Sequence, residues 1–294
     1  MIILLTIFQY LIQATVDLMD KFLITARKIE PVAYTFYTVA MGLLLVLFWP
    51  WSYFALPVKF ILLNLFSGAV FSLAMYVFFK ALSQGEASRV VPYVFALVPV
   101  FDVVLSLVTG RGRPTISEVS GIFLLVPGAL LISHQKGRVW GKYVIIKTVS
   151  ALLFSLYYLL WQYGAQNGPV LNNLIWNRIG AAAVLLSLLV YAPYRKKIFA
   201  IKKDPRKKST SAIFLFKQVL GGANFIFLSF LFVLGKISVI NALQGFRYVF
   251  LLLFSLVLSK TRKHLIAEEE GVGILSQKSF GVILVFAGTL LLFI

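Results

Sequence analysis

Apolar residues in this sequence gather in runs of about twenty, and short polar clusters separate the runs. A helix of that length crosses the hydrocarbon core of a bilayer and satisfies its own backbone hydrogen bonds. The pattern therefore predicts an all-α membrane protein with ten transmembrane helices. Their expected bounds are residues 2–24, 31–48, 60–79, 88–108, 118–132, 143–163, 169–191, 213–234, 238–258 and 279–294.

Composition favours a membrane protein over a soluble one. Of the 294 residues, 60% are hydrophobic and 13% are charged, whereas about a quarter of the residues in soluble domains are charged. The formal charge of +18 does not predict a nucleic-acid partner, because Lys and Arg lie mostly in loops. There they set the topology and meet anionic lipid headgroups. The expected surroundings are a lipid bilayer.

Several kinds of site are not expected from the sequence. It has no cysteine, and its two histidines, His134 and His264, lie in predicted loops, so a paired-histidine metal site is not expected. It has no glycine-rich phosphate loop followed by Lys and Ser or Thr, and therefore no ATP-driven motor. Asp17 and Asp20 are too few acids for a metal-dependent membrane transferase. We expect no enzyme activity, no metal and no cofactor.

The chain contains an internal repeat of five helices. The segment 85–88 (Gly-Glu-Ala-Ser) aligns with 235–238 (Gly-Lys-Ile-Ser). The glycine pair 121 and 128 aligns with 281 and 288, and the pair Pro31 and Gly42 aligns with Pro169 and Gly180. An odd number of helices per copy makes the second copy enter the membrane from the opposite side. We therefore expect two inverted five-helix repeats, residues 1–137 and 138–294, with a substrate site between them.

This layout resembles the ten-helix EamA-type members of the drug/metabolite transporter superfamily. The resemblance covers nearly the whole chain and implies a membrane transporter. The resemblance rests on a step of small residues before the fourth helix, a Pro-hydrophobic-Phe segment within that helix, and a glycine-rich fifth helix. They are Ala81-Leu82, Ala87-Ser88, Leu97-Val98-Pro99-Val100-Phe101, Glu118, Gly121 and Gly128.

Basic residues are distributed unequally between the two sides of the predicted bundle. The odd-numbered loops with their edges carry nineteen Lys and Arg residues, and the other loops carry four. Cytoplasmic loops are enriched in Lys and Arg, so this count predicts a cell-membrane protein with both termini outside. The family resemblance implies the opposite orientation, with both termini inside.

Polar side chains within the apolar runs are the candidates for a substrate site, since ionisable groups in membrane helices usually face a cavity or a partner. On the first helix, Gln13 and Asp17 share one face, and Tyr158 lies on a comparable face of the sixth. The full candidate set is Gln13, Asp17, Tyr76, Tyr93, Asp102, Tyr158, Asn177, Asn224, Asn241, Gln244, Arg247 and Tyr248.

Structural alternatives remain open for these residues. Asp17 can pair with Lys21 one turn later, and Asp20 and Lys21 can lie among the headgroups. Asp102 and Arg247 lie in repeat-related helices and can approach one another, either in a binding site or as a buried structural ion pair. Asp102 can also reach water near its helix end.

These features predict a secondary transporter of small polar metabolites that works by alternating access. Mixed acidic and basic groups suit zwitterions, so amino-acid-like solutes are the favoured substrates. The substrate gradient or a proton gradient would supply the energy, with Asp17 or Asp102 as the proton-accepting group. The alternatives are a flippase for lipid-linked substrates, a membrane accessory subunit that transports nothing, and a structural membrane partner.

Overall fold

The computed structural model describes residues 1–51, 56–109, 115–134, 140–200, 207–234, 240–241, 243–261 and 272–293, and every regular element within these ranges is a helix. The elements are α1 (Ile2–Thr25), α2 (Pro31–Gly42), the 3₁₀ helix η1 (Leu43–Trp51), α3 (Val58–Gln84), α4 (Ala87–Val108), α5 (Ile116–Ser133), α6 (Trp140–Ala165), α7 (Val170–Val190), α8 (Ala192–Ala200), α9 (Lys207–Leu234), α11 (Gly245–Thr261) and α12 (Val272–Phe293).

The predicted all-helical membrane fold is confirmed. In the described ranges nine helices are long and apolar enough to span a membrane, and α11 contributes a shorter apolar segment, Gly245–Leu258. Several bounds differ from expectation, among them the start of α9 at Lys207, six residues before the predicted one. The last helix begins at Val272, seven residues before the predicted start, and the second predicted helix changes to 3₁₀ geometry after Gly42. The predicted repeat match at residues 235–238 lies outside the described residues.

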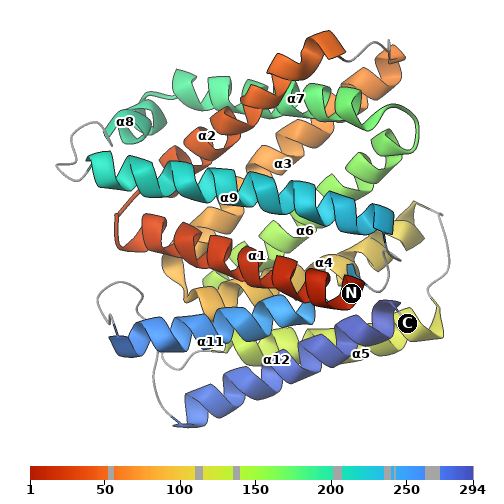
Figure 1. The fold of residues 1–294 in the computed structure, drawn as a ribbon, viewed down its shortest axis with the longest axis vertical. Coiled ribbons are helices and arrows are strands. Elements are labelled where there is room, and N and C mark those ends of the chain that lie inside the picture. Colours follow the sequence, from red (N-terminus) through yellow and green to blue (C-terminus); the bar gives the residue numbers. More distant parts are fainter. Residues whose placement is uncertain are drawn as a thin grey trace.

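The helices lie side by side, with both chain termini at one end of the bundle (Figure 1). Helices α5 and α12 pack together along one edge, while α2 and α7 lie at the opposite edge. Between them, α3 packs against α6 and α7, and α1 packs against α9 and α11. The first helix therefore contacts the second half of the chain along much of its length.

Four glycines let α5 and α12 approach each other closely. A Cβ atom built at Gly121 would lie 2.9 Å from the carbonyl oxygen of Gly288, and one built at Gly288 would lie 2.8 Å from that of Gly121. Gly128 and Gly281 face each other in the same reciprocal way. Close approach through small residues is a common way for helices to associate in lipid. The first glycine of one helix thus meets the last of the other, which is compatible with two inverted repeats.

A second close contact joins α3 to α7. A Cβ at Gly68 would lie 1.8 Å from the carbonyl oxygen of Asn177, and one at Gly180 would lie 2.0 Å from that of Leu65. Amide side chains add hydrogen bonds across the same interface, because Asn64 donates to Asn173 at 2.6 Å and Asn177 donates to the Ser67 hydroxyl at 3.2 Å. Asn177 therefore helps to hold two helices together.

Candidate functional site

A buried ion pair joins the middle of α1 to the start of α11. The Nε and Nη2 atoms of Arg247 donate to the two carboxylate oxygens of Asp17 at 2.7 and 2.8 Å. The side chains are 8% and 3% exposed, so both charges lie inside the protein. The two parallel bonds fix the guanidinium and the carboxylate in one plane. The spacing along α1 offered Lys21 as a partner for Asp17, but the structure pairs Asp17 with Arg247, which the sequence had matched with Asp102.

The polar face of α1 continues one turn towards the N-terminus. Asn224 of α9 donates to the side-chain oxygen of Gln13 at 2.8 Å, and the amide nitrogen of Gln13 lies 3.4 Å from Asp17. Both Asn224 and Asp17 are buried. The candidates Gln13, Asp17, Asn224 and Arg247 are therefore brought together as one polar network between α1, α9 and α11.

Sequence reasoning missed a second ion pair, one turn further along α1. Lys217 of α9 lies 2.6 Å from the carboxylate of Asp20, which also accepts a hydrogen bond from the Tyr34 hydroxyl. Lys217 and Asp20 are 5% and 7% exposed, so Asp20 is paired inside the protein. The sequence does indicate such a pair, because it places opposite charges inside two separate apolar runs, and a charge within a membrane span usually needs a partner.

Aromatic side chains surround the guanidinium of Arg247. Its Cζ lies 4.3 Å from the ring centroid of Phe95, a cation–π distance, and Tyr248 beside it is 1% exposed. Tyr158 is 41% exposed and its ring stacks 6.2 Å from that of Phe154. Of these rings, that of Phe95 is in direct contact with the guanidinium.

The predicted approach of Asp102 to Arg247 is not what the structure shows. Both guanidinium bonds of Arg247 go to Asp17, while Asp102 accepts a hydrogen bond from the Ser155 hydroxyl of α6. The reason is the packing of α11 directly against α1, which brings the Asp17 carboxylate to the guanidinium first. Asp102 is therefore bonded to α6, and Tyr158 interacts electrostatically with both Asp102 and Arg247.

The remaining candidates occupy several places. Tyr93 hydrogen-bonds Thr148 at 2.8 Å and forms a cation–π contact with Lys147, and Tyr76 packs 6.4 Å from the ring of Tyr194 on α8. Asn177 belongs to the α3–α7 interface. Asn241 and Gln244 are partly buried just before α11, where the Arg247 amide donates to the Gln244 carbonyl at 3.0 Å.

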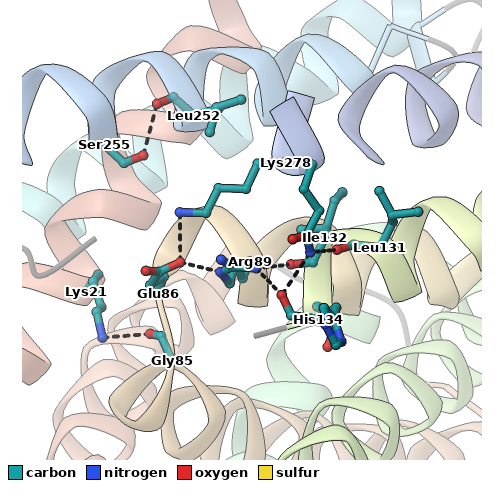
Figure 2. Close-up of polar contacts among 12 residues, drawn as sticks. Lys21, Gly85, Glu86, Arg89, Leu131, Ile132, His134, Leu252, Ser255 and Lys278 are labelled. Carbon is teal, nitrogen blue, oxygen red and sulfur yellow. Dashed lines mark hydrogen bonds and ion pairs between the residues drawn. The ribbon is translucent and has the colours of Figure 1, made fainter. Parts of the chain in front are cut away.

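A separate charge cluster lies at the end of the bundle opposite the termini (Figure 2). The Glu86 carboxylate accepts from Arg89 at 2.5 Å and from Lys278 at 2.8 Å, and all three side chains are at most 6% exposed. Arg89 also donates to the carbonyls of Ile132 and His134, which end α5.

The prediction that Arg89 and Lys278 are loop charges is wrong. Both were counted with the odd-numbered loops, yet they are buried against the acid that precedes α4. Lys21 contributes to the same region, donating to the carbonyls of Leu82 and Gly85 at 2.8 and 2.7 Å. The turn between α3 and α4 is thus tied to α1, α5 and α12.

Comparison with known proteins points to one family. The model of the EamA-like transporter family matches residues 1–134, so the predicted resemblance is confirmed over the first five spans, and the matched family is one of transporters. No curated protein matches the sequence. A solved structure described as "Crystal structure of protein" is 15% identical with a TM-score of 0.48, covering 99% of this chain and 94% of its own. A similarity at this level does not identify the fold or the function of the chain.

Proposed function

We propose that this chain, a multi-pass membrane protein whose residues 1–134 match the EamA-like transporter family, is a secondary transporter of small polar solutes. The family match supports a membrane transporter of small molecules. We further propose that transport occurs by alternating access and that the substrates are amino-acid-like zwitterions. This proposal is carried by one observation, the buried Asp17–Arg247 pair.

The pair offers the two charges that a zwitterion needs. A substrate carboxylate can take the place of Asp17 on the guanidinium fork, and a substrate ammonium can bind Asp17. Such an exchange replaces one ion pair by two and leaves no charge uncompensated inside the membrane. Gln13 and Asn224 beside the pair supply amide groups for the polar parts of the ligand.

The position of the pair suits alternating access. Asp17 and Asp20 belong to the first half of the chain, while Arg247, Lys217 and Asn224 belong to the second. The bonds that join these residues therefore break or shift if the two halves move relative to each other. In carriers built from repeats, the substrate site lies between the repeats near the midplane. The carboxyl of Asp17 is the proposed proton acceptor if transport is coupled to protons.

Solute counterflow in proteoliposomes tests the proposal. Purified protein is reconstituted in vesicles preloaded with an unlabelled amino acid, and uptake of the same labelled amino acid is followed across a panel of amino acids and other polar metabolites. We expect accumulation above that in empty vesicles for at least one zwitterion. Folded protein that exchanges no member of the panel would contradict a carrier function.

A pair of carboxylate variants locates the site. D17N removes the charge of Asp17 at nearly constant shape, so counterflow should fall by at least about tenfold, the effect of 1.4 kcal/mol. The control is E30Q, which neutralises a half-exposed carboxylate paired with Lys197 at 3.3 Å on the surface, and it should transport like the wild type. Wild-type counterflow by folded D17N would remove Asp17 from the site.

A further inference from the structure

Arg178 lies in the middle of α7 and has no acidic partner within the described part of the chain. Its Nε atom is buried without a hydrogen-bond partner. The contact that the structure gives its guanidinium is a cation–π contact, with Cζ 4.9 Å from the ring centroid of Phe71 on α3. The side chain as a whole is partly buried, and an aromatic ring does not neutralise a charge within a membrane span, so the guanidinium can take an anion as a ligand.

The buried cations of the spanning helices differ from Arg178, because within the described ranges each bonds an oxygen atom. The acceptors are Asp17 for Arg247, Asp20 for Lys217, Glu86 for Arg89 and Lys278, Ser133 for Lys147, and two backbone carbonyls for Lys21. A charged side chain within a membrane span is expensive and usually marks a pathway or a ligand site. Arg178, in the middle of its span, has a buried Nε atom for which the described ranges supply no acceptor.

Small and polar side chains surround the guanidinium. Gly42 of α2 lies directly opposite, since a Cβ built there would be 3.3 Å from the Arg178 Cδ and 3.5 Å from Nη1. Thr38, one turn earlier on α2, has a buried hydroxyl without a hydrogen-bond partner. Tyr157 of α6 interacts electrostatically with the guanidinium, and its hydroxyl has no hydrogen-bond partner among the described residues. The Nε atom of Arg178 and the hydroxyls of Thr38 and Tyr157 thus lack acceptors among the described residues.

Apolar groups form the rest of the surroundings. The ring of Phe71 lies 4.9 Å from that of Tyr157, and Phe71 also packs against a buried cluster of Val39, Ala181 and Leu185. A ligand that satisfies these donors therefore has an oxyanion at one end and an apolar body at the other. A second full charge on the ligand would find no counterion among these groups.

We propose that Arg178 is the anchor of a separate binding site for an amphipathic monoanion, whose carboxylate or phosphate oxygens bind the guanidinium while its apolar part lies against Phe71 and Tyr157. The oxyanion can come from a free organic acid or from an anionic lipid headgroup. This site shares no residue with the Asp17–Arg247 network, and its existence does not depend on transport activity.

Binding of benzoate to the purified protein tests the site, with benzamide as the neutral probe of the same shape. In phosphatidylcholine nanodiscs, the tryptophan fluorescence of the wild type reports binding, because Trp176 lies two residues from Arg178 and its ring is 5.2 Å from that of Trp49. We expect saturable binding of benzoate and none of benzamide. Absence of benzoate binding, or equal binding of both probes, would overturn the proposal.

The variant R178Q should weaken benzoate binding by about tenfold or more, since a hydrogen bond to a charged group is lost. R195Q is the matched control, because Arg195 is an exposed arginine on α8, and it should bind benzoate like the wild type. R178K keeps the charge but loses the planar fork, so its affinity should fall between the two. Wild-type affinity for benzoate in R178Q would overturn the proposal. If R178Q does not fold, R178K decides instead, and wild-type affinity for benzoate in R178K would overturn the proposal.

Lipid composition distinguishes the two sources of the anion. If an anionic headgroup fills the site, adding phosphatidylglycerol to the nanodiscs should reduce benzoate affinity in the wild type and have no such effect on the residual binding of R178K. If the ligand is a free acid, the wild type should bind benzoate equally in both lipids. Benzoate binding by E30Q, a surface variant outside both sites, should be normal in either case.

Discussion

Replacing Arg247 by Met or Asp17 by Leu leaves one charge of a buried pair without its partner. The two side chains are 8% and 3% exposed and share two hydrogen bonds of 2.7 and 2.8 Å, so no water is available to take over the lost bonds. Removing one member of such a pair costs about 3–5 kcal/mol of folding free energy. We expect each single variant, R247M and D17L, to be destabilised by that amount.

The double variant D17L/R247M should be far more stable than the sum of the two losses implies. Apolar side chains of similar size leave no uncompensated charge, and replacing a whole buried pair in this way is often close to neutral. With a loss of about 1–2 kcal/mol in the double variant, the coupling energy between the positions is at least about 4 kcal/mol. This magnitude separates a true pair from two charges that merely lie close together.

Reversible unfolding of the purified protein in mixed micelles, with dodecyl sulfate as denaturant, measures all four free energies. The exposed pair of Glu30 and Lys197, with 3.3 Å between its charged atoms, serves as the control cycle with E30Q and K197Q. Exposed pairs contribute about 0–1 kcal/mol, so that cycle should show little coupling. Additive losses at Asp17 and Arg247 would refute the argument that the two side chains act as one unit.

Further predictions concern packing, the charge cluster and topology. G68A should lose about 1–3 kcal/mol of stability because its Cβ would press on the backbone of α7, whereas G222A, with no atom within 4 Å of the built Cβ, should be neutral or slightly stabilised; equal melting temperatures for the two would contradict this. E86Q leaves Arg89 and Lys278 buried without a carboxylate and should cost about 3–5 kcal/mol in the same unfolding assay, while E30Q should cost less than about 1. Fusion of compartment-specific reporters should place the C-terminus outside, as the charge count predicts, and a C-terminal reporter active only in the cytoplasm would reverse the orientation.

The spans could be predicted well because each depends on local sequence. Twenty apolar residues satisfy their own backbone hydrogen bonds in lipid whatever surrounds them, so the positions of α1, α3, α4 and α7 follow from their runs. The start of α12 could not be predicted, because its first turns are less apolar and are joined to the end of α5, where Gln277 donates to the carbonyl of Leu131 at 2.6 Å. The short, basic helix α8 was likewise not predicted, because it contains no apolar run.

The residues of the candidate site were harder to predict from the sequence than the spans. The spacing of Gln13 and Asp17 placed both on one face of α1, and the structure does bring Arg247 and Asn224 to that face. Asn177 satisfied the same criterion, a polar group within an apolar run, yet it lies in the contact between α3 and α7. Periodicity shows which side chains share a face, but it does not show whether that face meets a neighbouring helix or a cavity.

The sequence alone determined that this is a helical membrane protein, where its spans lie, and that charges are placed inside them. It did not determine how those charges pair. Asp17 binds Arg247 and Asp20 binds Lys217 because α1 packs against α11 and α9. Arg178 has no acid among the described residues because α2 and α3, which pack against α7, contain no Asp or Glu. A span forms from bonds within one segment, whereas an ion pair needs two segments brought to the right distance and rotation, and only the tertiary structure fixes both.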